Sequence, residues 1–383
     1  MHATKAIAVA GAAAVSVLLA AGCGSSNSST STNSGGVSES TAASATSISA
    51  FGGMSGLVKA AKAEGQLNVI TLPDDWANYG TIMKDFTAKY GIKITDANPD
   101  GSSQDELNAI AQLKGQSRAP DVVDVGTAFA AKGEASGDWA AYKVQSWDNI
   151  PASAKSANGD YYADYGGYVA IGYDPKKVKV APTSFKDLLN PVYKNQVAIN
   201  GNPTQAGAAF AAVYAAALAN GGSLSDITPG IDYFKKLHQA GNFVPVTGSA
   251  STVESGQTPI LIWWDYLLAS EVKASGNPNF KIVIPSDAAY AAYYDQAISK
   301  YAPHPAAARL WEEYLYSVTG QNLWLEGQAR PIELNTLVSD GTVNKTAYSA
   351  LPAAPSSPLR LPTIAQQSAA EAVVAQQWSS VTG

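Results

Sequence analysis

The run Tyr168-Val169-Ala170-Ile171-Gly172-Tyr173 decides the fold class of this chain. Six consecutive apolar, aromatic or small residues predict a β-strand that is covered on both of its faces. On either side of this run, further short apolar runs alternate with stretches of helical spacing, which is typical of an α/β fold with a parallel sheet. The other predicted strands are residues 67–71, 92–95, 121–125, 259–264 and 281–284, and the predicted helices are residues 76–90, 105–113, 206–219, 305–318 and 365–378.

Length and composition limit the possible functions. The chain has 383 residues, which suits two domains better than one, and 46% of them are hydrophobic, enough to form a sizeable core. The formal net charge is −6 and there are no basic runs, which argues against nucleic acid as a partner. One cysteine and three histidines exclude a disulfide framework and a cysteine-rich metal site.

The N-terminal region has the pattern of a targeting segment. Lys5 precedes an apolar run over residues 6–21 that is too short to span a bilayer, so residues 1–22 are expected to be a signal peptide. The sole cysteine follows in Leu19-Ala20-Ala21-Gly22-Cys23, which resembles a bacterial lipobox and implies that Cys23 is acylated. Residues 24–50 are almost entirely Ser, Thr, Gly, Asn and Ala, so residues 23–55 are interpreted as a lipidated cysteine and a flexible linker. The expected product is an extracytoplasmic lipoprotein anchored to the cell membrane.

Aromatic and polar residues gather where several predicted strands end. Open α/β sheets bind ligands outside the carboxyl ends of their strands. A purely structural loop would favour Gly, Pro and Ser, so we interpret these loops as candidate binding positions. They are Asp74-Asp75-Trp76, Gly126-Thr127, residues 200–205 with Gln205 at their end, and Trp264-Asp265-Tyr266.

Three groups of residues, taken in order, carry a resemblance to a known family. From about Gly65 to Pro331 the chain resembles the extracellular solute-binding proteins of ABC importers, which have the two-lobed type II periplasmic-binding fold. The residues that carry the resemblance are Val169-Ala170-Ile171-Gly172-Tyr173-Asp174 with Pro182-Thr183-Ser184-Phe185-Lys186-Asp187-Leu188, then Gly256-Gln257-Thr258-Pro259-Ile260, then Ala302-Pro303-His304-Pro305 through Ala308 with Tyr316-Ser317 and Gly320-Gln321.

This resemblance implies a domain organisation and a function. Lobe one would comprise residues 56–166 plus 287–383 and lobe two residues 167–286, with hinge crossings near Gly166-Gly167 and near residues 284–286. A monomer would capture a small polar or cationic organic solute between the lobes and deliver it to a membrane permease. Closure would follow from the ligand's preference for the closed state. The resemblance implies no catalysis, no cofactor and no metal of its own.

Within the family, the likeness is greatest to the polyamine-binding members. Trp76-Ala77-Asn78-Tyr79, Trp264-Asp265 and Tyr293-Tyr294-Asp295 resemble their aromatic and acidic motifs. The likeness implies ligand contacts for Trp76, Tyr79, Trp264 and Asp295, because ammonium groups bind over aromatic faces and beside carboxylates. Gln205 stands about where a second acid would be expected, and Asp265 replaces an amide. The altered acids favour a monocationic or mixed polar ligand over a linear polyamine. With Thr127, these residues complete the predicted site.

Other interpretations stay open at this stage. Trp263 and Trp264 are adjacent in a strand, so their side chains point to opposite faces and one of them is expected in the core. Trp76 and Tyr79, three residues apart at a helix start, share one face, which could be the cleft or the core. Ferric-ion binders of this fold use paired tyrosines, for which Tyr293-Tyr294 is a candidate, and tryptophans also stack on sugars.

A secreted serine hydrolase is the distant alternative. Ser270-Glu271-Val272-Lys273 matches the Ser-x-x-Lys pattern of penicillin-interacting enzymes, but the companion Ser-Asp-Asn and Lys-Thr-Gly motifs are missing. Nothing pairs His238 or His304 with a nucleophile. The sequence therefore favours a binding protein over an enzyme.

Overall fold

The computed structural model describes residues 37–275, 277, 279–352 and 361–382. All of them belong to one unit of the chain, Thr32–Gly383. The predicted signal peptide and the predicted acylation site, Cys23, lie outside the described residues. Within the described part, no helix is both long enough and apolar enough to cross a membrane.

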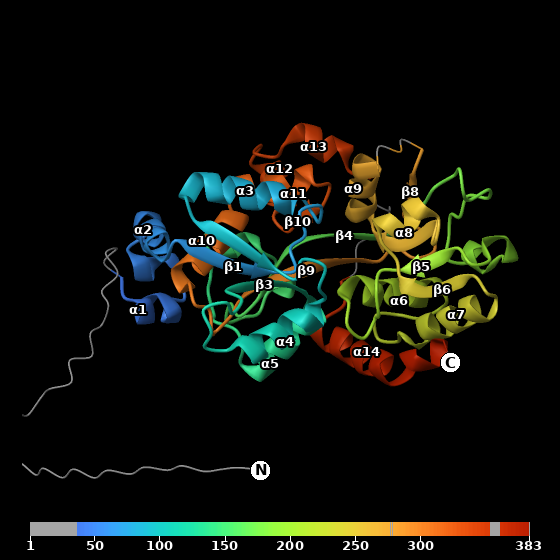
Figure 1. Cartoon of the computed structure of the whole chain (residues 1–383), viewed down its shortest axis with the longest axis horizontal. Coiled ribbons are helices and arrows are strands. Elements are labelled where there is room, and N and C mark those ends of the chain that lie inside the picture. Colours follow the sequence, from blue (N-terminus) through green and yellow to red (C-terminus); the bar gives the residue numbers. More distant parts are fainter. Residues whose placement is uncertain (1–36, 276, 278, 353–360, 383) are drawn as a thin grey trace, which may run out of the picture. The chain divides into compact units, whose positions relative to one another are not determined.

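The long strand β4 (Tyr162–Tyr173) contains the run that decides the fold, and it is buried along its whole length. Its first part pairs antiparallel with β9 (Ala291–Ile298). From Val169 onward it pairs antiparallel with β7 (Ile260–Trp264). β4 therefore takes part in two groups of strands, and Figure 1 shows it running from one group to the other.

The first group of strands surrounds β9 and the beginning of β4. β9 also pairs antiparallel with β3 (Val122–Gly126), and the short β10 (Arg330–Pro331) pairs with β4. β1 (Gln66–Ile70) and β2 (Lys93–Ala97) form a parallel pair, and β1 contacts β3. The helices of this part are α2 (Met54–Glu64), α3 (Tyr79–Tyr90), α4 (Ser103–Leu113), α5 (Thr127–Ser136), η2 (Trp147–Asn149), η3 (Ala152–Ala154), α10 (Pro305–Leu315) and α11 (Val318–Glu326).

The second group of strands surrounds β7 and the end of β4. β7 pairs in parallel with β5 (Val197–Ile199), which pairs in parallel with β6 (Phe243–Thr247), while β8 (Lys281–Val283) pairs antiparallel with β4. The helices of this part are η4 (Asp187–Leu189), η5 (Pro191–Tyr193), α6 (Gly207–Ala219), α7 (Thr228–Gln239), α8 (Ala250–Ser255) and α9 (Asp265–Ser275).

The predicted parallel sheet is correct only in part, because the sheets are mixed. β3 with β9, β9 with β4, and β4 with β7 are antiparallel pairs. The alternation of strands and helices does predict the parallel pairs β1–β2, β5–β6 and β5–β7. It fails for β4 and β9, because these two strands carry the chain between the groups in opposite directions, and no crossover helix joins them in parallel.

The elements predicted from the sequence are confirmed as helices or strands. Two predicted helices have different boundaries in the structure, because the backbone leaves the helical conformation there. The helix predicted from residue 76 begins at Tyr79, because Ala77 and Asn78 have positive φ angles of 45° and 71°, which a helix does not allow. The helix predicted over 305–318 ends at Leu315, and α11 begins after its N-cap, Ser317.

The folded body begins before the predicted end of the linker at residue 55. α1 (Glu39–Ser44) is capped by the Ser38 side chain, and η1 (Ile48–Phe51) follows it. Ala42, Ala45 and Phe51 are buried, and α1 contacts α10. Polar composition predicts a linker here, but a few apolar residues are enough to dock the segment on α10.

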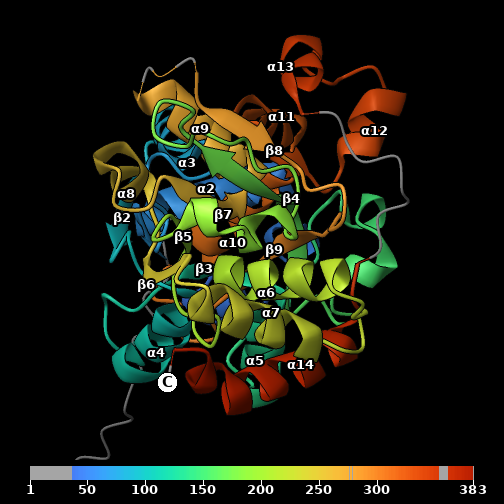
Figure 2. The ribbon, with the colours of Figure 1, turned by 90° about the vertical axis from the view of Figure 1, so that its right-hand side faces the viewer.

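The C-terminal segment extends over both groups of strands. α12 (Leu334–Ser339) and α13 (Lys345–Ala350) follow β10. α14 (Ile364–Gln377), continued by η6 (Trp378–Val381), contacts both α5 and α7 (Figures 1 and 2). A 2.5 Å ion pair joins Lys132 of α5 to Glu371, while the Trp378 ring packs on Phe234 of α7.

Candidate functional site

A cavity of about 630 Å³ lies where strands of both groups end. Its walls come from the loops after β1, β2, β5 and β6, together with residues near the carboxyl ends of β3 and β7. This is the position at which open α/β sheets bind ligands. A cavity of this size suits a small organic molecule.

Three aromatic side chains from separate elements form one wall of the cavity. They are Trp76 before α3, Trp263 at the end of β7, and Tyr294 of β9. The Trp76 ring meets the Trp263 ring edge-on at 5.9 Å and the Tyr294 ring at 5.8 Å between centroids. The half-buried Trp76 and Trp263 belong to different groups of strands, so this wall is built from both.

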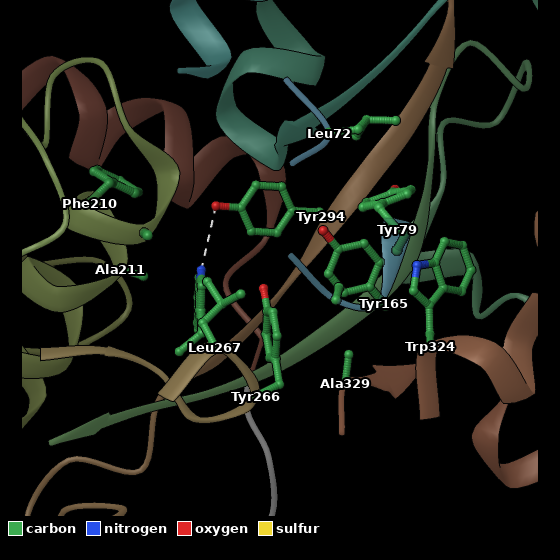
Figure 3. Close-up of a cluster of buried hydrophobic side chains, with 14 of the residues drawn as sticks. Leu72, Tyr79, Tyr165, Phe210, Ala211, Tyr266, Leu267, Tyr294, Trp324 and Ala329 are labelled. Carbon is green, nitrogen blue, oxygen red and sulfur yellow. Dashed lines mark hydrogen bonds between the residues drawn. The ribbon is translucent and has the colours of Figure 1, made fainter. Parts of the chain in front are cut away.

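Hydrogen bonds from two tyrosines that lie behind the cavity wall fix the position of Asp124. The Tyr79 and Tyr165 hydroxyls both donate to Oδ2 of Asp124, each at 2.8 Å. Trp76 Nε1 donates to the Tyr165 hydroxyl at 2.6 Å. Figure 3 shows Tyr79, Tyr165 and Tyr294 gathered in this region, and Tyr165 stacks on Tyr294 at 6.0 Å.

Glu106 of α4 and Asp124 of β3 form the acidic part of the cavity wall. Oε2 of Glu106 accepts a hydrogen bond from the Asp124 backbone N–H at 3.1 Å. Burial raises the pKa of Glu106 well above its usual range, and the charge of Asp124 adds to the shift. Burial also raises the pKa of Asp124, although the hydrogen bonds from Tyr165 and Tyr79 oppose the shift.

The rest of the lining is polar and carries no positive side chain. Among the described residues that line this cavity there is no Lys, Arg or His. The cavity can therefore accommodate positive charge and hydrogen-bond donors far better than an anion. The acids are Asp75, Asp100, Asp105, Glu106 and Asp124, and the amides and hydroxyls include Asn200, Asn202, Gln205, Thr247, Ser249 and Ser251.

Two of the predicted ligand residues line this cavity, and two lie close to it. Trp76 and Gln205 are in its wall. Tyr79 is fully buried behind Asp124, to which it donates its hydrogen bond. Thr127, at the start of α5, lines two smaller cavities of about 20 and 30 Å³.

The other predicted ligand residues are buried outside the large cavity. Trp264 is 2% exposed, and its Nε1 lies 3.5 Å from the Tyr294 hydroxyl. Asp265 is paired with Arg330 at 2.6 Å and accepts hydrogen bonds from the Tyr168 and Tyr266 backbone N–H groups.

Asp295 is also buried outside the large cavity, in the wall of the 30 Å³ cavity. Burial raises its pKa to about 8, against a hydrogen bond with Thr127. No observation tests these residues as ligand contacts, and they stay predictions.

Sequence reasoning did not single out Glu106, Asp124 or Trp263 as ligand residues, and it named Tyr294 only within the Tyr293-Tyr294-Asp295 motif and as half of a candidate ferric-binding pair. The signal for Trp263 was present, because two adjacent tryptophans in a strand must face opposite ways. A signal for Asp124 was also present, since it stands within an otherwise apolar strand. Nothing in the spacing indicates that Glu106 would lie beside it.

The described residues contain no group of three or more His, Cys, Asp or Glu side chains able to hold a metal ion. The adjacent Tyr293 and Tyr294 do not both face the large cavity, because only Tyr294 is in its wall. Tyr293 lines the two smaller cavities.

The sequence matches a family model over residues 117–353, and the model describes bacterial extracellular solute-binding proteins. The chain belongs to this family. No curated protein sequence matches the chain at a significant level. Members of the solute-binding family capture small molecules outside the cytoplasm and pass them to ABC permeases, which sets the general role of this chain.

Solved structures similar to this solute-binding protein share its fold. The periplasmic binding protein AfuA from Actinobacillus pleuropneumoniae, with fructose-6-phosphate bound, is 20% identical, with a TM-score of 0.65 over 83% of this chain and 98% of that one. Iron-bound HitA from Pseudomonas aeruginosa is 20% identical, with a TM-score of 0.59 over 82% and 99%. The spermidine/putrescine-binding protein PotD from Streptococcus pneumoniae is 14% identical, with a TM-score of 0.57 over 83% and 99%. The fold is thus the type II periplasmic-binding fold predicted from the sequence, while the ligands of these neighbours differ in class.

Proposed function

We propose that this solute-binding protein captures a small cationic organic solute, an amine, and delivers it to an ABC permease. The observation that carries the proposal is the chemistry of the 630 Å³ cavity, which has five acids, three aromatic rings and, among its described lining residues, no basic side chain. Aromatic faces attract an ammonium group by about 0.5–2 kcal/mol each, and carboxylates add charge-assisted hydrogen bonds. A phosphorylated sugar would instead need a positive side chain in this wall.

The proposed binding residues combine the sequence prediction with the geometry. Trp76 and Gln205 keep the contact role that the sequence predicted. Trp263 takes the role predicted for Trp264, since Trp263 lies in the cavity wall and Trp264 is buried. Tyr79 acts through Asp124. Asp265, Asp295 and Thr127 would act only indirectly, from behind the wall.

The proposed mechanism is closure of two lobes, with lobe one at 56–166 plus 287–383 and lobe two at 167–286. Support comes from β4, which changes its pairing partner from β9 to β7 between Tyr168 and Val169, next to the predicted crossing at Gly166-Gly167. A ligand that touches both walls favours the state in which they approach. On this proposal the chain performs no chemistry and acts as a monomer.

We further propose that acylated Cys23 anchors the protein to the cell membrane. The support is the lipobox-like sequence that ends at Cys23. In the Cys23→Ala variant we expect the protein in the culture medium, measured by fractionation and immunoblotting. Retention of this variant in the membrane fraction would contradict acylation as the anchor.

The decisive test of the ligand class is a thermal-shift and calorimetric screen of the purified protein. The panel contains putrescine and ethanolamine as amines and choline as a quaternary ammonium ion, with glucose, fructose-6-phosphate and ferric citrate as the alternatives. A ligand present at a hundred times its Kd raises the free energy of unfolding by about 2.7 kcal/mol. We expect such a shift from at least one amine and none from the phosphorylated sugar. Saturable binding of ferric ion, glucose or the sugar phosphate without any amine would refute the proposed class.

A further inference from the structure

Glu106 and Asp124 are hydrogen-bonded neighbours in the lining of the cavity, and each keeps one carboxylate oxygen without a hydrogen-bond partner. Glu106 is 1% exposed and Asp124 is 6% exposed, and both line the cavity. Oε2 of Glu106 and Oδ2 of Asp124 are occupied by the hydrogen bonds described above. Oε1 of Glu106 and Oδ1 of Asp124 are buried and have no hydrogen-bond partner. Two buried acceptors without donors are costly unless a ligand or a proton satisfies them.

The groups around this pair supply no compensating positive charge. Every titratable neighbour that interacts with Glu106 or Asp124 among the described residues is an acid or a phenol. Two ionised carboxylates in such surroundings repel each other, which favours one proton on the pair. The neighbours are Asp105 on α4, Asp96 on β2, Tyr79 on α3, Asp164 and Tyr165 on β4, Tyr266 on α9, Tyr294 and Asp295 on β9, and Glu312 on α10.

We propose that Glu106 and Asp124 form a subsite for one ammonium group that carries N–H donors, and that this group enters in exchange for a proton. The inference rests on the proposed function and specifies which part of the solute is recognised. The carboxylic proton leaves to solvent, and the ammonium N–H groups donate to Oε1 of Glu106 and Oδ1 of Asp124. No covalent bond changes.

The subsite distinguishes cations by the number of hydrogen-bond donors on their nitrogen atom. A primary or secondary ammonium group can donate two hydrogen bonds, one to each free oxygen, whereas a quaternary ammonium group has none to give. Trp76 and Tyr294 offer aromatic faces that any of these cations could use. Discrimination between an amine and its fully methylated analogue therefore reports on the acid pair and not on the aromatic wall.

Titration calorimetry of the full-length protein tests this subsite. The probes are putrescine and its fully N-methylated analogue, each measured at about pH 5.5 and about pH 8 in buffers of different ionisation enthalpy, since an ordinary Asp or Glu would be ionised at both. We expect net proton release on putrescine binding near pH 5.5, an affinity at least about tenfold higher near pH 8, and at least about tenfold weaker binding of the methylated analogue.

Variants connect these effects to the two residues. Glu106→Gln and Asp124→Asn should each weaken putrescine binding and remove most of its pH dependence. Asp148→Asn, an exposed acid outside the cavity, is the matched control and should keep both the proton release and the preference for N–H donors. Proton release is measured on the unaltered protein, so the proposal can be tested even if a variant does not fold.

The outcomes separate this inference from the proposed function. Binding of putrescine without proton release, or unchanged binding by folded Glu106→Gln and Asp124→Asn variants, overturns the subsite and leaves amine capture standing. Displacement of putrescine by calcium or potassium with the same proton release overturns the assignment to an ammonium group. If the panel above yields no amine ligand at all, the proposed function is refuted, and the subsite that rests on it is refuted with it.

Discussion

At the scale of single residues, two neighbouring tryptophans in β7 have different surroundings. Trp263 lies in the cavity wall, and its ring meets Trp76 edge-on. Trp264 points to the other face of the strand, where it is buried and stacks on Tyr266 at 6.3 Å. The alternation of side chains along a strand is the physical reason for this division.

Replacing each tryptophan by alanine should separate binding from stability. Trp263→Ala should weaken amine binding about tenfold or more, equivalent to about 1.4 kcal/mol. Trp264→Ala should instead lower the free energy of unfolding by about 3–5 kcal/mol, as is usual for a large buried aromatic side chain. Urea unfolding measures stability and titration calorimetry measures affinity, with Trp263→Phe as the control that keeps an aromatic face. The reverse pattern would place Trp264 in the binding site.

At the scale of elements, the two glycines in the middle of β4 mark where strands and side chains crowd together. A Cβ atom on Gly166 would lie 2.2 Å from the Ala292 carbonyl oxygen of β9. A Cβ atom on Gly167 would lie 2.3 Å from Oδ1 of Asp265, which also accepts the Tyr168 N–H. The absence of side chains at these positions lets β4 pass between β9 and the start of α9.

Gly166→Ala should therefore be costly. The contact with the Ala292 backbone cannot be relieved by turning a side chain, so we expect a loss in the free energy of unfolding toward the upper end of the about 1–3 kcal/mol typical of overpacking. Gly341→Ala is the comparison, since nothing lies near its Cβ position and only its φ of +70° opposes the change, at about 1 kcal/mol. Denaturant unfolding of both variants decides the matter, and equal losses would show that crowding at Gly166 is unimportant.

Local patterns in the sequence predict the family fold and part of its elements, but not β5, β6 or β9 and not the pairing between distant segments. The apolar run at 168–173 identifies β4, and its neighbours identify α6 and β7. The antiparallel course of β9 depends on contacts more than a hundred residues apart, as in the pairing of Tyr162 with Gln296. The same limit applies to the site, because Glu106, Asp124 and Tyr294 meet only through tertiary structure.

At the scale of the whole molecule, buried acids are spread through the part that contains the cavity. Burial raises the pKa of Glu64 to about 7 and the pKa values of Asp295 and Glu312 to about 8. The unfolded chain would lose these protons near pH 4 to 5. Between that range and pH 8, the folded protein holds more protons than the unfolded chain, so stability falls as the pH rises.

We accordingly expect the ligand-free protein to be more stable near pH 5 than near pH 8. The difference should be at least about 1.4 kcal/mol, the equivalent of one pKa unit on one of these groups. Urea unfolding followed by circular dichroism at the two pH values measures it. Glu312→Gln replaces one of these buried acids by an uncharged side chain of similar size. It should therefore reduce the dependence of the free energy of unfolding on pH. Greater stability at the higher pH would mean that these acids are ionised in the folded protein.

The position of α14 bears on how far the two proposed lobes could move apart. The middle of α14 is joined to α5 through the ion pair of Glu371 with Lys132, and Trp378 after its end packs against Phe234 and Phe243. A movement that separates α5 from α7 must break or shift one of these two contacts. If the lobes open as proposed, the C-terminal helix would permit small movements and oppose large ones.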